Sequence, residues 1–214
     1  MKHLIRIIAA VSVMATLASC QAQPKKNGND IKLSLIPPAG KAVAAFAEGC
    51  FWCSEHIFEA VTGVDSAVSG YAGGNAPNPT YELVNTETTG HAESVLVYYD
   101  PKLISYTELL KVFFTSHDPT TPDRQGPDRG NSYRSIIFYK TLAEKTLAEQ
   151  AKQDFANSFK NPIVSEILPL TEFNKAEGYH QNYIKHNANN PYVSGVSVPR
   201  FELFKRTYKG KLKH

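Results

Sequence analysis

The sequence has little net charge and only three cysteines, and it has no long apolar run beyond the one near its start. Its net charge is +3 over 214 residues, and the single dense basic run, at 205–213, predicts a solvated, frayed C-terminal end. A nucleic-acid-binding protein normally carries a basic stripe along its body, so that class is excluded. No stretch after residue 20 is apolar enough to span a bilayer, which needs about 20 apolar residues.

What the chain does contain is material for a packed core. Apolar residues make up 42% of it, including 11 Tyr and 11 Phe, which excludes wholesale disorder and coiled-coil or collagen-like architectures. The length predicts one domain, or at most two small ones.

The first 20 residues have the pattern of a bacterial export signal. Lys2 and Arg6 supply a positive start, and residues 7–18 supply a short apolar stretch. The following Leu-Ala-Ser-Cys, which ends at Cys20, resembles a lipobox, in which the cysteine is lipidated; an ordinary cleavage site with a chance cysteine is the alternative. We predict a signal peptide over 1–19, a lipidated tether over 20–40 and a folded domain over 41–214. The predicted location is the cell envelope, with the lipid on a bacterial membrane.

Short strands alternate with helices in the body of the chain. Apolar runs predict strands at 42–47, 64–69, 94–99, 135–139 and 163–168. Helical spacing and capping pairs predict helices at 53–61, after Ser105 and from Thr141 to about Phe159. Beyond Phe173 the periodicity fades, so we expect coil with one helical turn near 177–183. The order predicts an α+β fold, a two-layer α/β plait (ferredoxin-like) with a long C-terminal coil.

Two cysteines lie where a predicted strand gives way to a predicted helix, in the run Gly49-Cys50-Phe51-Trp52-Cys53. The positive end of a helix and its unpaired N–H groups favour thiolate over thiol. Cys53 lies one turn beyond Cys50, so a disulfide between them is feasible, but closing so short a loop stabilises little. With Cys20 assigned to lipid, no second pair of cysteine ligands remains for zinc or copper. Redox chemistry is favoured over a structural disulfide or a metal site.

The same run resembles the signature of the A-type peptide-methionine sulfoxide reductases, which reduce the S epimer of methionine sulfoxide, free or in proteins. Matching segments follow in the same order at 70–74 (GYAGG), 79–81 (PTY), 90–93 (GHAE), 133–135 (YRS) and 176–181 (AEGYHQ). The resemblance covers about 42–192. It implies an α+β plait with a C-terminal coil and a thioredoxin-like reductant, without cofactor or metal, and we expect a monomer.

The resemblance also implies the catalytic roles. Cys50 is the nucleophile that attacks the sulfoxide sulfur. Glu93 is the acid that protonates the departing oxygen, because an uncompensated oxyanion is a poor leaving group. Tyr81 and Tyr133 donate hydrogen bonds to that oxygen. On its own, a Glu before an apolar strand is more typical of solvated surface, and the matching segments around Glu93 reverse this interpretation.

The remaining site residues, by the same resemblance, shape the pocket. Phe51 and Trp52 form an apolar wall for the substrate methyl group, as aromatic surface favours sulfur contacts. Asp128 helps to hold the polar end of the site. The alternatives are that Phe51 and Trp52 belong to the core and that Asp128 is a turn residue.

Many family members carry resolving cysteines near the C-terminus, whereas residues 190–198 of this chain contain none. The recycling thiol therefore comes either from Cys53, the internal candidate, through a disulfide with Cys50, or from outside the chain. Two other functions compete with this interpretation. A thioredoxin-like CxxC thiol–disulfide oxidoreductase would explain the cysteine pair but not the segment around Glu93. A metal-binding or adhesive lipoprotein would have no catalysis at all.

Overall fold

The computed structural model describes residues 32–213. The predicted signal peptide, the predicted lipidation site at Cys20 and most of the predicted tether lie outside the described residues. The strands are β1 (Ala42–Glu48), β2 (Val64–Ala72), β3 (Ala92–Tyr99), β4 (Arg124–Gln125), β5 (Asp128–Arg129), β6 (Ser135–Tyr139), β7 (Glu166–Pro169) and β8 (Asn174–Lys175). The helices are α1 (Phe51–Glu59), α2 (Tyr81–Val84), α3 (Tyr106–Ser116), α4 (Leu142–Phe155), α5 (Tyr183–His186) and α6 (Val198–Thr207).

A mixed, mostly antiparallel sheet forms the centre of the molecule. Its strand order is β7-β6-β1-β3-β2-β8, and β4 pairs only with β5 in a separate small hairpin. All neighbours in the large sheet are antiparallel except β6 and β7. Strand β1 lies between β3 and β6, so that Ala45 is paired with both Leu96 and Phe138. The chain therefore combines α and β elements in one sheet-centred unit.

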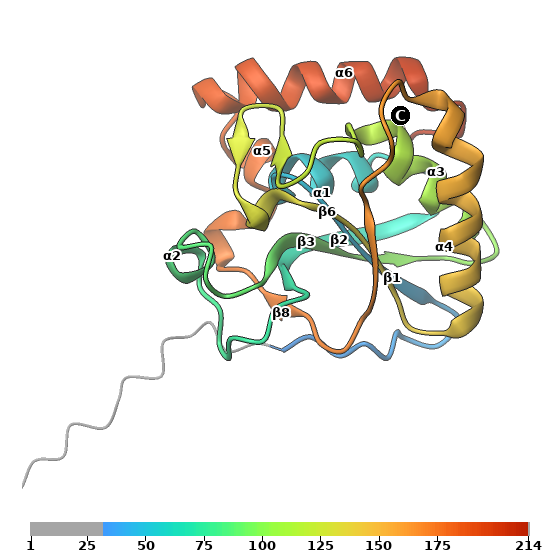
Figure 1. Cartoon of the computed structure of the whole chain (residues 1–214), viewed down its shortest axis with the longest axis horizontal. Coiled ribbons are helices and arrows are strands. Elements are labelled where there is room, and N and C mark those ends of the chain that lie inside the picture. The colour runs from blue at the N-terminus through green and yellow to red at the C-terminus, as the bar shows by residue number, and fades with distance from the viewer. Residues whose placement is uncertain (1–31, 214) are drawn as a thin grey trace, which may run out of the picture.

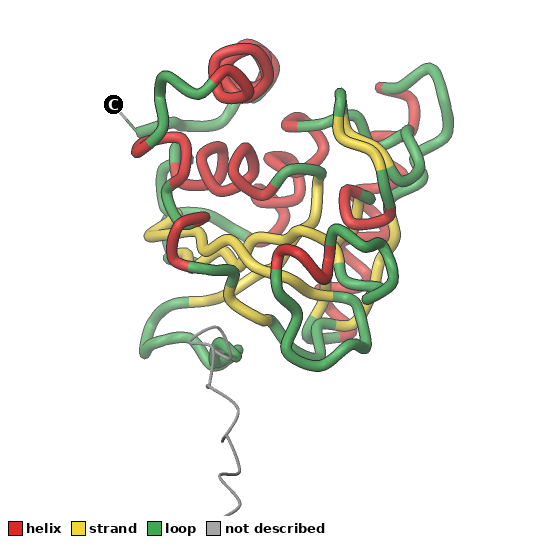
Figure 2. Tube along the Cα trace, turned by 90° about the vertical axis from the view of Figure 1, so that its left-hand side faces the viewer, coloured by secondary structure: helices red, strands yellow, loops and turns green. Residues whose placement is uncertain are grey.

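The two faces of the sheet are covered differently (Figures 1 and 2). Helices α1, α3 and α6 lie on one face, where Ala44 and Phe46 of β1 join their apolar side chains. The alternate residues of β1 point to the other face, which is covered by extended chain, including Leu33 and Phe173, rather than by helices. Both faces are buried, which explains why β1 is apolar at successive positions.

Both predicted capping residues cap their helices, but the reciprocal capping box predicted for Ser105 and Glu108 is only half formed. The Ser105 hydroxyl accepts a hydrogen bond from the Glu108 N–H at 3.1 Å, at the start of α3. Thr141 and Glu144 form a reciprocal capping box at the start of α4. Helix α4 ends at Phe155 and a short 3₁₀ turn follows over 156–158, so the predicted helical stretch to Phe159 is slightly too long.

The two ends of the domain differ from expectation. The tether was expected to extend to residue 40, but Lys32 already bridges to Asn174, and the Leu33 N–H donates to the Phe173 carbonyl at 3.0 Å. At the other end, the expected coil contains helix α6. The tail beyond α6 is not a frayed end either, because the Lys213 N–H donates to the Ala60 carbonyl at 2.7 Å. In the stretch from 32 to 213 no helix is long and apolar enough to cross a membrane.

Candidate active site

Cys50 caps the N-terminus of α1. Its carbonyl accepts hydrogen bonds from the N–H groups of Cys53 and Ser54 at 3.1 and 3.3 Å, which places the thiol at the positive end of the helix. Gly49 makes the sharp turn out of β1, with φ of 86°. A Cβ at Gly49 would lie 2.4 Å from Gln125 Cβ, so only glycine fits between the strand and the β4–β5 hairpin.

Glu93 lies near the start of β3 and is buried, with 2% of its surface exposed. Its Oε2 accepts a hydrogen bond from the Phe51 N–H at 3.0 Å, so the carboxyl sits against the same helix terminus as Cys50. Burial raises the pKa of Glu93 to about 8, against the opposing effect of that hydrogen bond. The carboxyl is therefore mostly protonated at neutral pH.

One cavity of about 300 Å³ brings the predicted residues together. Its lining consists of Cys50, Phe51, Trp52, Tyr81, Glu93, Asp128, Tyr133, Asn190 and Tyr192. Seven of these are the residues that the sequence predicts for the nucleophile, the acid, the hydrogen-bond donors, the apolar wall and the polar end. They come from five separate parts of the chain, and the fold places them around a single space. Cys53, the eighth predicted residue, does not line this cavity.

The aromatic side of the cavity is held by a second layer of side chains. The Trp52 indole N–H donates to His180 Nδ1 at 3.0 Å, and its ring stacks on Tyr183 with centroids 3.7 Å apart. The Tyr81 N–H donates to Glu177 at 3.0 Å, and the Tyr81 ring lies against His180. These contacts fix the two aromatic rings before any ligand enters.

The polar side depends on Asp128 and Tyr192. The Tyr192 hydroxyl donates to Asp128 Oδ2 at 2.5 Å. Burial raises the pKa of Asp128. Burial also raises the pKa of Tyr133, with the nearby Glu93 contributing, so this phenol stays protonated and able to donate a hydrogen bond.

The position at the helix N-terminus was expected to favour the thiolate of Cys50, but the pKa of this thiol is raised. Burial, followed by the neighbouring Cys53, raises the pKa of the Cys50 thiol. A hydrogen bond from Cys50 lowers the pKa of Cys53 to about 6, assisted by the guanidinium of Arg200 and the hydroxyl of Ser197. The pair therefore loses its first proton easily, but the negative charge rests mainly on Cys53, because this sulfur lies on the side of Arg200.

Arg200 is held in place by a buried acid. Its NH2 group lies 3.0 Å from Glu48 Oε1, and its Nε–H donates to the Ser116 carbonyl at 2.8 Å. Burial raises the pKa of Glu48 to about 7, against the opposing charge of Arg200. Neither Glu48 nor Arg200 was predicted from the sequence, since Glu48 ends a strand and Arg200 lies in the segment expected to be coil.

The comparisons with known proteins agree with this arrangement. The family model described as peptide methionine sulfoxide reductase matches residues 42–212. The chain belongs to this family. Membership does not favour a thioredoxin-like oxidoreductase or a non-catalytic lipoprotein. The family match also begins at β1 and ends in the docked C-terminal tail, so it covers the whole sheet and the helix layer.

Relatives from distant organisms cover most of the chain. The peptide methionine sulfoxide reductase MsrA 1 of Rhodopirellula baltica is 45% identical, covering 81% of this chain and 91% of that protein. The MsrA of Thermus thermophilus is 44% identical, covering 80% and 97% respectively. Among solved structures, reduced Mxr1 of Saccharomyces cerevisiae has a TM-score of 0.69 at 34% identity, covering 73% of this chain and 94% of that one. Methionine sulfoxide reductase A of Corynebacterium diphtheriae also has a TM-score of 0.69, at 30% identity, covering 77% and 91%.

Two cavity residues, Asn190 and Tyr192, were missed by the sequence analysis. Asn190 Oδ1 accepts a hydrogen bond from the Tyr192 N–H at 2.8 Å, and its Nδ2–H donates to the Tyr183 hydroxyl at 3.2 Å. Both residues lie in a stretch that was expected to be coil, where an isolated polar or aromatic residue has no periodic signal. Within residues 32–213, no group of three or more His, Cys, Asp or Glu side chains is placed to hold a metal ion.

Proposed function

We propose that this chain reduces the S epimer of methionine sulfoxide, free or in proteins, to methionine. One observation carries the proposal: a single cavity holds a cysteine at a helix N-terminus and a buried carboxyl with a raised pKa, together with Tyr81 and Tyr133. The family membership supports the same reaction. The choice of epimer rests on the resemblance to the A-type enzymes.

In the proposed first step, the Cys50 sulfur attacks the sulfoxide sulfur while Glu93 protonates the oxygen. The oxygen then passes to Cys50, which becomes a sulfenic acid, and methionine leaves. A proton shift from Cys50 to Cys53 supplies the Cys50 thiolate, because the two sulfurs share one negative charge. Tyr81 and Tyr133 donate hydrogen bonds to the developing oxyanion.

The substrate methyl group is proposed to lie against Phe51 and Trp52. Both rings line the cavity, and Phe51 is fully buried. Aromatic rings contact sulfur and methyl groups favourably, by about 0.3–1.5 kcal/mol for a sulfur contact. Asp128, held by Tyr192, is proposed to orient the polar end of the substrate.

Recycling is proposed to use Cys53. Its thiolate attacks the sulfur of the Cys50 sulfenic acid, hydroxide leaves and takes up a proton from solvent to become water, and a Cys50–Cys53 disulfide forms. Both cysteines are free and buried in this structure, and they lie within hydrogen-bond contact. A thioredoxin-like dithiol then reduces the disulfide. This partner is supported by the solved complex of Mxr1 with Trx2, in which Mxr1 is 27% identical to this chain with a TM-score of 0.51.

The cellular setting and the fold class are also proposals. We propose that the mature chain begins at Cys20, is lipidated there and repairs oxidised proteins of the cell envelope as a monomer. The support is the lipobox-like sequence alone.

We class the fold as a two-layer plait of the ferredoxin-like kind, supported by the central order β6-β1-β3-β2 with α1 and α3 on one face.

The decisive experiment uses purified protein with dithiothreitol and each epimer of methionine sulfoxide. We expect methionine from the S epimer alone, measured by chromatography. Cys50→Ala should form none, because no other sulfur lines the cavity. Equal reduction of both epimers would contradict the substrate assignment, and full activity in Cys50→Ala would overturn the mechanism.

A further inference from the structure

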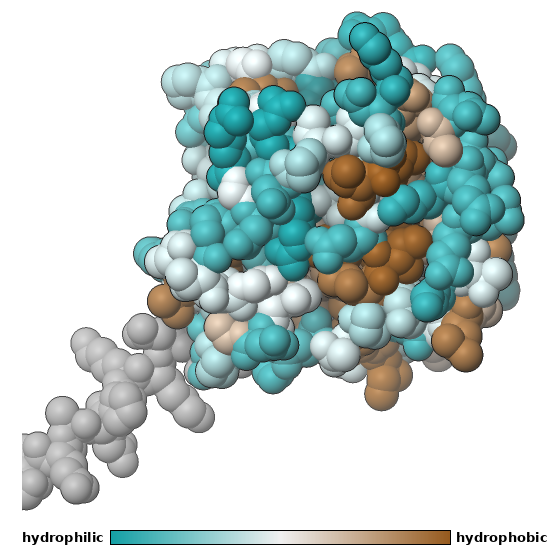
Figure 3. Space-filling model, viewed as in Figure 1, coloured by the Kyte–Doolittle hydropathy of each residue, from teal (hydrophilic) through white to brown (hydrophobic). Residues whose placement is uncertain are grey.

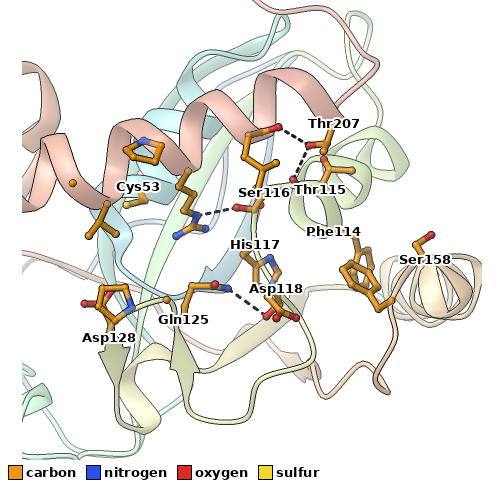
Figure 4. A pocket seen from close by; sticks show the side chains of 18 of the residues that line it. Cys53, Phe114, Thr115, Ser116, His117, Asp118, Gln125, Asp128, Ser158 and Thr207 are labelled. Carbon is orange, nitrogen blue, oxygen red and sulfur yellow. Dashed lines mark hydrogen bonds between the residues drawn. The ribbon is translucent and has the colours of Figure 1, made fainter.

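The two cysteines line two different cavities. Cys50 lines the 300 Å³ cavity, whereas Cys53 lines a separate cavity of about 750 Å³. Asp128 and Tyr192 line both, so this hydrogen-bonded pair forms the wall between them. The larger cavity, with Cys53 on one side and Asp128 on another, is shown in Figure 4. A molecule in the larger cavity approaches Cys53 without crossing the space occupied by a sulfoxide.

The floor of the larger cavity combines a thiol with a buried cation. Arg200 lines it together with Cys53, only 12% of its side chain is exposed, and its Nε–H donates to the Ser116 carbonyl at 2.8 Å. An incoming thiolate is attracted by this guanidinium. The floor therefore suits thiol–disulfide exchange at Cys53, in which a thiolate must reach a sulfur.

The walls of the larger cavity are apolar and extend well beyond the thiol. They come from the C-terminal parts of α3 and α4, from the segment that follows α4, and from α6 and the turn before it. The residues are Phe114, Phe155, Phe159, Val196, Pro199 and Leu203. Apolar residues surround a hollow between α6 and α4 on this face in Figure 3. Leu203 is 53% exposed on α6. A small thiol needs only the floor, whereas such walls offer contact area to apolar residues that flank a cysteine in a protein.

We propose that the larger cavity is the docking site for a protein dithiol of the thioredoxin-like kind, whose cysteine-bearing segment enters along the apolar walls and attacks Cys53. The partner's thiolate forms a bond to the Cys53 sulfur, the Cys50–Cys53 bond breaks, and Cys50 leaves as a thiolate. The partner's second cysteine then loses its proton and attacks the sulfur of the partner's first cysteine in this mixed disulfide. This attack releases Cys53 as a thiolate. The partner ends as a disulfide. The released proton is taken up by Cys50, whose pKa is raised, so the enzyme ends with the Cys50 thiol and the Cys53 thiolate.

This inference rests on the proposed function, so the first measurement is methionine formed in a single turnover by the wild-type protein. The second traps the exchange with a thioredoxin that lacks its resolving cysteine, added to the oxidised enzyme. Peptide mass spectrometry should find the mixed disulfide on Cys53. A mixed disulfide on Cys50 would overturn the docking proposal. A wild-type protein that forms no methionine would instead overturn the proposed function.

The walls are tested by a matched pair of exposed leucines. Leu203→Glu puts a carboxylate on the apolar wall, and Leu147→Glu puts one on α4 away from both cavities, where Leu147 is 40% exposed. We expect Leu203→Glu to raise the KM for thioredoxin about tenfold or more, as for a contact at the centre of an interface. Turnover with dithiothreitol should fall far less, because a small thiol needs only the floor.

The control variant Leu147→Glu separates an effect on thioredoxin docking from the general effect of adding a carboxylate to the surface. Leu147→Glu should keep the wild-type KM for thioredoxin and for methionine sulfoxide. An unchanged KM for thioredoxin in Leu203→Glu would overturn the docking proposal, and so would equal losses with thioredoxin and dithiothreitol. A concentration-dependent dimer of wild-type protein that Leu203→Glu abolishes would assign the walls to a second copy of this chain and overturn the proposal as well.

Discussion

Replacing Glu93 by Gln should slow catalysis and stabilise the fold at the same time. Gln has nearly the same shape and keeps an oxygen to accept the Phe51 N–H, but it cannot supply a proton to the substrate oxygen. A positioned general acid contributes roughly 10²–10⁴ to a rate, so methionine formation should fall by that factor. In the wild-type protein the rate should decline as pH rises through about 8, because the carboxyl then loses its proton, and the variant should lack this decline.

The stability change follows from the same pKa. The folded protein holds the Glu93 proton up to a pH of about 8, whereas the unfolded chain releases it near 4.5. The folded state thus binds more protons between these values, and the free energy of unfolding of the wild-type protein falls as pH rises through this window. At about 1.36 kcal/mol per pH unit, the full penalty is about 5 kcal/mol above pH 8. Gln carries no charge and escapes this penalty.

Urea unfolding of both proteins at pH 5 and pH 9 measures the effect. We expect the Gln variant to gain roughly 4 kcal/mol relative to wild type between these two pH values. Glu82→Gln, which removes an exposed carboxyl on α2, serves as the control and should show no such change. A gap between wild type and Glu93→Gln that is the same at both pH values would refute the raised pKa, and with it the assignment of Glu93 as an acid at neutral pH.

Three further predictions concern the sulfurs. Arg200→Gln should raise the pKa of Cys53, so thiolate absorbance should titrate at higher pH. Thioredoxin-driven turnover at pH 7 should fall and should recover as the pH rises. An unshifted titration would exclude the guanidinium as a cause of the low pKa of Cys53. Cys53→Ser should still form about one methionine per enzyme but turn over poorly with thioredoxin, with partial rescue by small thiols; wild-type cycling would reduce Cys53 to a packing role. Mass spectrometry of the mature N-terminus should find a diacylglyceryl thioether on Cys20, and an unmodified Cys20 would refute the lipid anchor.

The local pattern of the chain predicted most of the helices and strands. The caps at Ser105 and Thr141 and the apolar run of β1 mark elements whose signal lies in neighbouring residues. Helix α6 was missed because only one of its side chains, Phe204, is fully buried, so its apolar periodicity is weak. Its Pro199 near the first turn, and the spacing of Phe201, Phe204 and Tyr208, were the available signals.

The site was predicted from motif resemblance rather than from physics alone. The sequence places Cys50 at a helix start, but nothing local shows that Glu93 is buried against that helix, because this depends on the pairing of β3 with β2 and β1. The charge on Cys53 likewise depends on Arg200, which lies far along the chain. Long-range contacts of this kind have no signature in a single sequence. Tyr192 was missed for the same reason, although it closes the cavity next to Asp128.

The wall formed by Asp128 and Tyr192 has a kinetic consequence. Some enzymes bind two reactants alternately in one site. Excess of either reactant then inhibits them, because it occupies the enzyme form that must bind the other reactant. Here the two cysteines line separate cavities on either side of the hydrogen-bonded pair Asp128 and Tyr192, so sulfoxide and reductant need not exclude each other. We expect ping-pong rate laws in which high concentrations of reductant do not compete with methionine sulfoxide. Molecules that fill only the larger cavity should then lower the maximal rate while leaving the affinity for the sulfoxide intact.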